Sequence, residues 1–246
     1  MPDETPAFKE IERRGSGPFT TQRRRRRPDG AEVEFSAWRH RKGYGLIDPA
    51  DPGGKRHIEW WAPHRRGWWI AVLFLVGSAW FAVGVFGPTA SWLGSAVGWV
   101  CFIGSIFFTS AAYMQYYEAT NEGDDIEGLG RSSRLFGIRA TSLGWGAPAI
   151  QLIGTVAFNV STFMALRDLS TAQEEVLVWV PDMVGAACFL VASTLVIVET
   201  HDRIRGMLFG SRDARIAGLK MLGAMACGIS AIAAFVVPGA GELVTA

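Results

Sequence analysis

The uncharged stretch from Gly67 to Tyr117, GWWIAVLFLVGSAWFAVGVFGPTASWLGSAVGWVCFIGSIFFTSAAYMQYY, decides the fold class of this chain. A water-soluble domain does not leave so long a run without a single Asp, Glu, Lys or Arg, because many of its residues would face water. In a bilayer the same run provides two helices and a tight turn, since one crossing takes about 20 residues. The sequence therefore predicts an all-α, polytopic membrane protein.

Apolar stretches of similar length continue along the chain and predict five transmembrane helices. Each is long enough for a helix that rises ~1.5 Å per residue to cross a hydrocarbon core of ~30 Å. The predicted spans are 67–87, 92–113, 146–166, 176–198 and 216–237. We expect Pro88, Pro181 and Pro238 near the ends of spans, where a missing backbone N–H costs least.

These spans divide the chain into segments. The first two spans form one hairpin, 67–113, and the next two form a second hairpin, 146–198. Between and around them lie a basic tail at 1–66, expected to be partly extended or disordered, and two loops at 114–145 and 199–215. The segment 216–246 holds the fifth helix and the C-terminus.

The distribution of Lys and Arg predicts the orientation of the chain in the membrane. With the N-terminus inside, 23 of the 24 basic residues lie in the tail, in the two loops or at Lys220, and only Arg167 lies outside. Because basic residues concentrate on the cytoplasmic side, we predict a cytoplasmic N-terminus, an outer C-terminus and a location in the plasma (cell inner) membrane. Tryptophans at the expected interfaces, such as Trp68, Trp145 and Trp179, agree with these boundaries.

The spans also indicate an internal duplication. The first and third spans match when shifted by 77 residues, so that Leu75-Val76-Gly77-Ser78 meets Leu152-Ile153-Gly154-Thr155. The second and fourth spans match at a shift of 87, so that Cys101-Phe102-Ile103 meets Cys188-Phe189-Leu190. Both hairpins start inside, so we predict two parallel repeats related by an axis along the membrane normal, with a fifth helix added.

The first hairpin, with Phe102-Ile103-Gly104-Ser105 in its second helix and Arg65-Arg66 before its first, resembles the YrhK-like family of small bacterial membrane hairpins. The resemblance covers about residues 65–115 and, more weakly, 140–200. It implies a membrane hairpin fold and a membrane location, and it implies no particular chemistry.

The third span carries a polar face. Gln151, Thr155, Asn159 and Thr162 recur at helical spacing, and Asn159 lies near the middle of the span. Since lipid offers an amide no hydrogen-bond partner, this face must point into protein or water. It favours either hydrogen bonding between helices or a path for a polar solute from Asn159 outward to Asp182.

The second span carries a face of small residues that predicts close helix packing, within the bundle or between chains. Its members are Gly94, Gly98, Cys101, Ser105 and Thr109.

The basic tail contains an unbroken run of arginines close to the first span. An anionic inner leaflet would attract these residues, by about 1 kcal/mol for each. We therefore expect them to bind anionic lipid or a protein partner, whereas nucleic acid is a less favoured ligand. The residues concerned are Arg23, Arg24, Arg25, Arg26, Arg27, Arg65 and Arg66.

The remaining polar residues predict no cofactor and no metal site. The four histidines do not have the spacing of a zinc motif, and the acidic loop around Asp124 and Asp125 lacks the spacing of a calcium-binding loop. The three cysteines lie in apolar stretches, as small buried side chains do.

These features favour a non-enzymatic function. The leading hypothesis is an accessory or assembly protein that packs against other membrane proteins or lipids, and the chain is also a candidate for homo-oligomer formation. The alternative hypothesis is a small channel or transporter for a polar solute that uses the polar face of the third span.

Overall fold

The computed structural model describes residues 9–14, 22–26, 30–36, 61, 63, 66–86, 96–121, 134–139, 143–204 and 212–236. Within these residues, five helices are long and apolar enough to cross a membrane. They confirm the predicted all-α, polytopic fold and indicate a multi-pass integral membrane protein. Helices are the expected structure there, because each backbone N–H and C=O must find its partner inside the segment when no water is present.

The long helices lie close to the predicted spans. They are α2 (Arg66–Phe86), α3 (Val97–Thr120), α4 (Leu143–Met164), α6 (Val180–Ile204) and α7 (Arg212–Val236). The second and the fourth helix differ clearly from the prediction. In the second, helix α3 begins at Val97 instead of 92 and continues past 113 to Thr120, so the first part of the predicted loop 114–145 is helical.

The fourth span begins earlier than predicted and contains its proline. Helix α5 (Thr171–Glu174) and a π-helical turn, η3 (Glu175–Trp179), lead directly into α6. Pro181 therefore lies inside a helical segment instead of at its end. Because a proline has no N–H for the carbonyl one turn earlier, the wider turn before it, in which the Val180 N–H bonds to Glu175 O, re-pairs part of the backbone.

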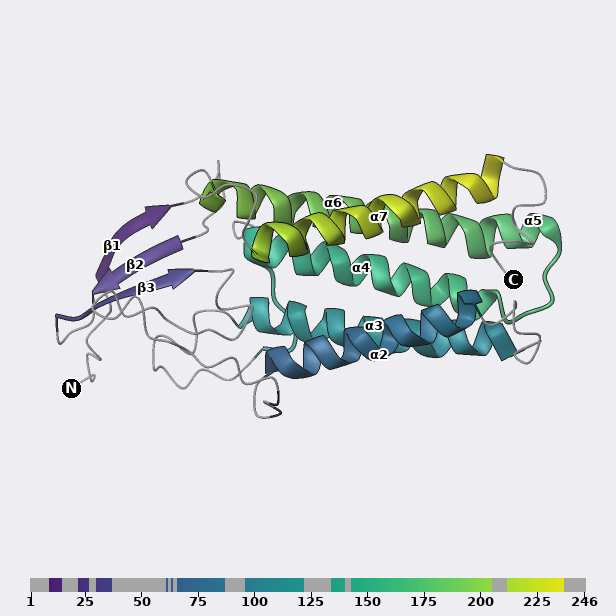
Figure 1. Ribbon diagram of the computed structural model, residues 1–246, viewed down its shortest axis with the longest axis horizontal. Helices are drawn as coiled ribbons and strands as arrows, with labels where there is room; N and C mark the ends of the chain where they lie inside the picture. Colours follow the sequence, from purple (N-terminus) through teal and green to yellow (C-terminus); the bar gives the residue numbers. More distant parts are fainter. Residues whose placement is uncertain are drawn as a thin grey trace.

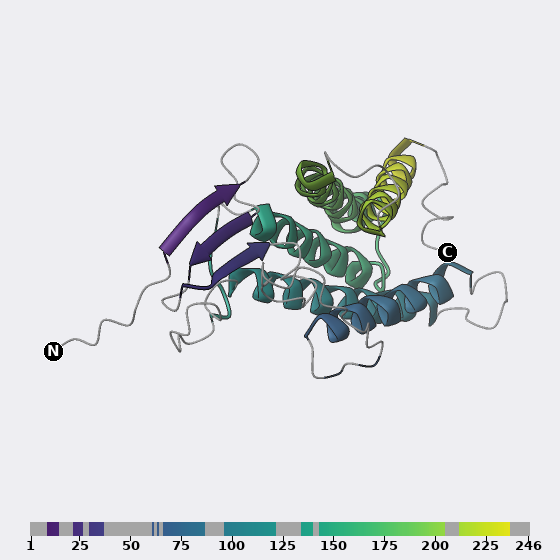
Figure 2. The ribbon, with the colours of Figure 1, turned by 60° about the vertical axis from the view of Figure 1, so that its left-hand side comes forward.

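The helices pack in sequence order. Helix α2 packs on α3, α3 on α4, α4 on α6 and α6 on α7, whereas α2 and α7 share no substantial packing. Helices α2, α4 and α7 run in one direction along the long axis, and α3 and α6 run in the other (Figure 1). A second view separates the α2–α3 pair from the α6–α7 pair, with α4 between them (Figure 2).

The two hairpins have equivalent close crossings. In the first, a Cβ added at Gly77 would lie 2.6 Å from Phe108 Cδ2 and 3.0 Å from Gly104 O. In the second, a Cβ added at Gly154 would lie 2.9 Å from Cys188 Cβ and 3.1 Å from Gly185 O. These contacts match Gly77 with Gly154, at the predicted shift of 77 residues.

For the second helix of each hairpin the contacts give a different register. They match Gly104 with Gly185, which are 81 residues apart, whereas the sequence comparison favoured 87. The ring contacts agree with both shifts, because Phe81 matches Phe158 at 77 residues and Phe108 matches Phe189 at 81. The predicted shift of 87 residues for the second helix therefore differs from the contacts, and the duplication and the direction of its axis stay predictions.

The described part of the N-terminal tail forms a small antiparallel sheet, which the sequence analysis did not predict. Its strands, β1 (Lys9–Arg14), β2 (Gln22–Arg26) and β3 (Glu32–Ser36), pair in the order β1-β2-β3. Gly30 has a φ of 86°, a conformation that favours glycine and suits the turn between β2 and β3. The sheet lies at the end of the molecule where α2 begins and α3 ends (Figure 1).

Candidate functional site

A cluster of five polar side chains joins α3 to α4 within the membrane-spanning part. We call it the polar cluster, and it consists of Ser105, Thr109, Thr155, Asn159 and Thr162. Asn159 Nδ2 donates to Thr109 Oγ1 at 2.8 Å, and the Ser105 and Thr162 hydroxyls lie 3.0 Å apart. The prediction that Asn159 faces a neighbouring helix is confirmed.

The hydroxyls of the polar cluster are also bonded to the main chain. Thr155 Oγ1 donates to Leu152 O at 2.8 Å, and Ser105 Oγ donates to Phe102 O at 2.7 Å. Thr109 Oγ1 donates to Thr155 O on the facing helix at 3.3 Å. Ser105 and Thr155 are each only 1% exposed, so this part of the interface is closely packed.

One acceptor of the polar cluster has no partner in the described part of the chain. Asn159 Oδ1 is buried and accepts no hydrogen bond, although the amide nitrogen of the same side chain is bonded. A buried polar atom without a partner costs free energy, because it has lost its bonds to water. A water molecule or a polar solute could donate a hydrogen bond to this oxygen.

The predicted polar face is divided between two sets of contacts. Gln151 lies apart from the polar cluster, and its Oε1 accepts a hydrogen bond from Lys220 of α7 at 3.2 Å. Asp182 lies in the first turn of α6, and among the described residues no hydrogen bond joins it to Asn159. A path from Asn159 to Asp182 therefore stays a prediction.

The predicted packing face of α3 divides between two neighbouring helices. Cys101 faces α2, where its Sγ would lie 2.5 Å from a Cβ added at Gly84. Gly98 faces Leu166 just beyond α4, and Ser105 and Thr109 belong to the polar cluster. Gly94 lies outside the described residues. The glycine at the closest crossing is Gly104, which the spacing argument missed and which the shared glycines of the two hairpins could have revealed.

A second group of contacts, also missed from the sequence, fixes the segment 134–139 against the end of α3. Asn121 donates to Arg134 O at 2.8 Å and accepts from Arg134 N at 2.7 Å, as a paired backbone would. Tyr116 makes the same double contact with the main chain of Gly137. Trp145 Nε1 donates to Thr120 Oγ1 at 3.1 Å and ties the start of α4 to this end of α3.

The arginines of the tail are partly neutralised within the sheet. In the backbone register, Arg24 lies between Glu12 and Glu34. Arg26 Nη2 donates to Glu32 Oε1 at 2.8 Å, and this hydrogen bond lowers the pKa of the Glu32 carboxyl. Arg27 and Arg65 lie outside the described residues, as does the side chain of Arg23.

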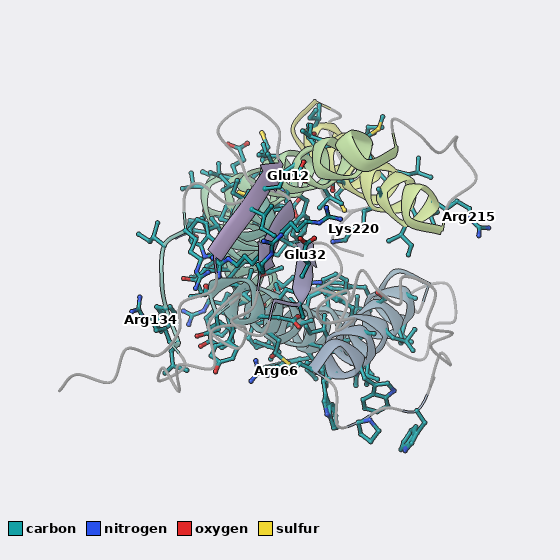
Figure 3. The ribbon with its side chains drawn as sticks, turned by 90° about the vertical axis from the view of Figure 1, so that its left-hand side faces the viewer. Glu12, Glu32, Arg66, Arg134, Arg215 and Lys220 are labelled. Atoms are coloured by element: carbon teal, nitrogen blue, oxygen red, sulfur yellow. The ribbon has the colours of Figure 1, made fainter. Side chains whose placement is uncertain are left out.

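Arg66 and the sheet occupy one end of the helices. The Arg66 guanidinium lies 5.2 Å from the centre of the Tyr117 ring, a cation–π contact. Arg66, Arg215 and Lys220 come from helices that begin near the sheet, and Arg134 lies in the segment 134–139 against the end of α3 (Figure 3). The tryptophans at the start of α2 gather there too, with Trp69 Nε1 donating to Pro63 O at 2.9 Å.

The chemistry of the polar cluster is that of neutral hydrogen-bonding groups. It holds hydroxyls and one amide, which can orient a polar solute or fasten two helices together. Among the described residues, no group of three or more His, Cys, Asp or Glu side chains is arranged to hold a metal ion.

Comparison with known proteins gives no relative. No protein-family model, no curated protein and no solved structure matches the chain. The resemblance to the YrhK-like family therefore stays a prediction.

Proposed function

We propose that this chain is a non-enzymatic accessory or assembly subunit that packs against other membrane proteins. The observation that supports the proposal is the exposure of small residues on both outer helices. Helix α2 exposes Ala71, Ser78 and Ala82, and α7 exposes Gly223 and Ser230. Small residues allow two helix backbones to approach closely, and transmembrane helix interfaces are enriched in them.

The interior of the molecule supports the same proposal. The hydroxyls of the polar cluster form hydrogen bonds with neighbouring side chains and with main-chain carbonyls, as expected of groups that hold two helices together. Such contacts contribute about 0.6–2 kcal/mol each, enough to fix how α4 sits on α3.

Purification of the tagged full chain in a gentle detergent tests this proposal. We expect a second membrane protein to co-purify in fixed stoichiometry, as determined by mass spectrometry and native mass. A chain that elutes with no other protein from every mild detergent tried would contradict the accessory function.

We propose that the chain lies in the plasma membrane with the sheet and the N-terminus in the cytoplasm. The described basic residues at the sheet end of the helices, against Arg167 at the other end, support this orientation. There basic residues such as Arg66 would contact anionic lipid headgroups.

Reporter fusions provide a prediction for this orientation. Alkaline phosphatase fused after Ala246 should be active in a bacterial host, because the enzyme folds only outside the cytoplasm. The same enzyme fused after Arg212 should be inactive. The reverse pattern would overturn the proposed orientation.

A second candidate function is passage of a polar solute along α4, and the unpaired Asn159 Oδ1 favours it. The two functions differ in whether water reaches position 159. In a chain with Cys101, Cys188 and Cys227 replaced by alanine, we expect Asn159→Cys to be protected from water-soluble thiol reagents, because the neighbouring Thr155 is 1% exposed. A cysteine introduced at exposed Ser170 is the positive control, and rapid labelling at position 159 would favour passage.

A further inference from the structure

Three helices of the chain carry a glycine in the same local setting. Leu75-Val76-Gly77-Ser78 in α2 and Leu152-Ile153-Gly154-Thr155 in α4 are followed by Met221-Leu222-Gly223-Ala224 in α7. The first two glycines are the sites where the second helix of each hairpin crosses. The third lies on α7, which has no second helix after it in the described part of the chain.

The packing of α7 shows that the likeness extends beyond the glycine. Helix α4 packs on the preceding helix α3 through its polar face, and α7 packs on the preceding helix α6 through a row of small buried residues. The residues that occupy equivalent places, each pair 69 residues apart, are Pro148 with Ala217, Thr155 with Ala224, Asn159 with Gly228 and Thr162 with Ala231. The hydrogen bond between Gln151 and Lys220 joins another pair at this spacing.

In this register Gly223 is the equivalent of Gly154 and Gly77. At those two glycines an added Cβ would come within 2.9 Å and 2.6 Å of the helix that crosses there. At Gly223 an added Cβ would meet nothing within 4 Å. Helix α7 is thus built like the first helix of a third hairpin whose second helix is supplied from elsewhere.

We propose that the face of α7 around Ile216, Gly223 and Ser230 binds a transmembrane helix of another protein. That helix runs antiparallel to α7 and carries small residues at its crossing point, as Gly104-Ser105 and Gly185-Ala186 do on α3 and α6. The proposal rests on the accessory function proposed above and names the surface and the kind of segment that it recognises.

A second copy of this chain fits the surface poorly. Copies that share one orientation in the membrane can offer only α3 or α6 as an antiparallel helix, and each of these already packs between two neighbours. Viewed along the helices from the sheet end, α2 and α7 form the two ends of an open arc (Figure 3). The incoming helix would extend the arc from α7 on its open side, toward α2.

The experiment uses a single-span reporter that contains the segment Val180–Val198, which carries Gly185-Ala186, inserted in the outside-to-inside direction. The full chain and the reporter are labelled outside their spans and reconstituted in phosphatidylcholine–phosphatidylglycerol vesicles, and association is measured by energy transfer. We expect specific association that weakens about tenfold or more with Gly223→Leu in the chain, or with Gly185→Leu in the reporter. Leu222→Ala in the chain, one residue away on a different side of α7, is the matched control and should leave association unchanged.

Three results would overturn the proposal. One is reporter association that Gly223→Leu does not weaken. Another is energy transfer between two differently labelled copies of the chain that Gly223→Leu abolishes, which would assign the face to self-association. The third is a natural partner that co-purifies equally with the wild-type chain and with Gly223→Leu, which would leave the accessory function standing but show that this surface does not bind the partner. Reporter binding without any co-purifying natural partner would support this surface and contradict the accessory function.

Discussion

Replacing Gly154 with leucine is expected to destabilise the α4–α6 hairpin by about 3 kcal/mol or more, at or above the upper end of the usual cost of overpacking. The added side chain would start 2.9 Å from Cys188 Cβ and 3.1 Å from the main-chain oxygen of Gly185. The obstacles are a backbone oxygen and a Cβ, so no rotation of a flexible side chain relieves the clash. The two helices would have to separate along their whole contact.

The measurement is reversible unfolding of the purified chain in mixed detergent micelles, followed by circular dichroism and tryptophan fluorescence. Gly77→Leu should behave like Gly154→Leu, because its Cβ would lie 2.6 Å from Phe108 and 3.0 Å from Gly104 O. Gly223→Leu is the matched control and should unfold like the wild-type chain. Equal stability of all three variants would mean that the glycines do not set the helix crossings.

The transmembrane helices could be predicted from the sequence because their cause is local. A long uncharged run has few soluble alternatives, and in lipid its backbone must be helical. Helix ends were harder to predict. The apolar run indicated an end for α3 near Tyr113, yet the helix continues because Tyr116, Thr120 and Asn121 find partners outside the apolar span.

The polar face of α4 could be predicted in part. Its spacing alone required that Asn159 face another helix, but periodicity within one helix does not identify the partner, which is Thr109. The expected link to Asp182 depended on how α6 is rotated about its axis. The π-helical turn before Pro181 is a local feature that a regular helical spacing does not anticipate.

The sheet in the tail was missed because its sequence resembles a solvated charged segment. Four arginines in a row, Arg23 to Arg26, would repel one another in an isolated strand. In the backbone register, Glu12 and Glu34 of the two neighbouring strands lie opposite Arg24, and the Glu32 carboxylate pairs with Arg26. The Pro28-Asp29-Gly30 sequence after the run was the available signal for a hairpin turn.

Replacing Asn121 with alanine is expected to release the segment 134–139 from the end of α3. The side chain is 6% exposed and makes three hydrogen bonds, one to Tyr117 O at 2.8 Å and two to the main chain of Arg134. Alanine removes all three and leaves the N–H and C=O of Arg134 without their partners. The expected cost is about 2–3 kcal/mol of local stability, because three hydrogen bonds are lost and each contributes ~0.5–1.5 kcal/mol.

Hydrogen exchange measures this loss directly. The amides of Arg134 and Gly137 should exchange at least about tenfold faster in Asn121→Ala, since each 1.4 kcal/mol of opening free energy is a factor of ten. Tyr113→Phe is the control, because it removes only a 3.4 Å contact to Leu135 O in an exposed position and should change exchange little. Amides in the middle of α4 should keep their protection in both variants, since the polar cluster lies far along the helix from Asn121. Exchange at Arg134 that is the same in Asn121→Ala as in the wild-type chain would show that other contacts hold this segment against α3.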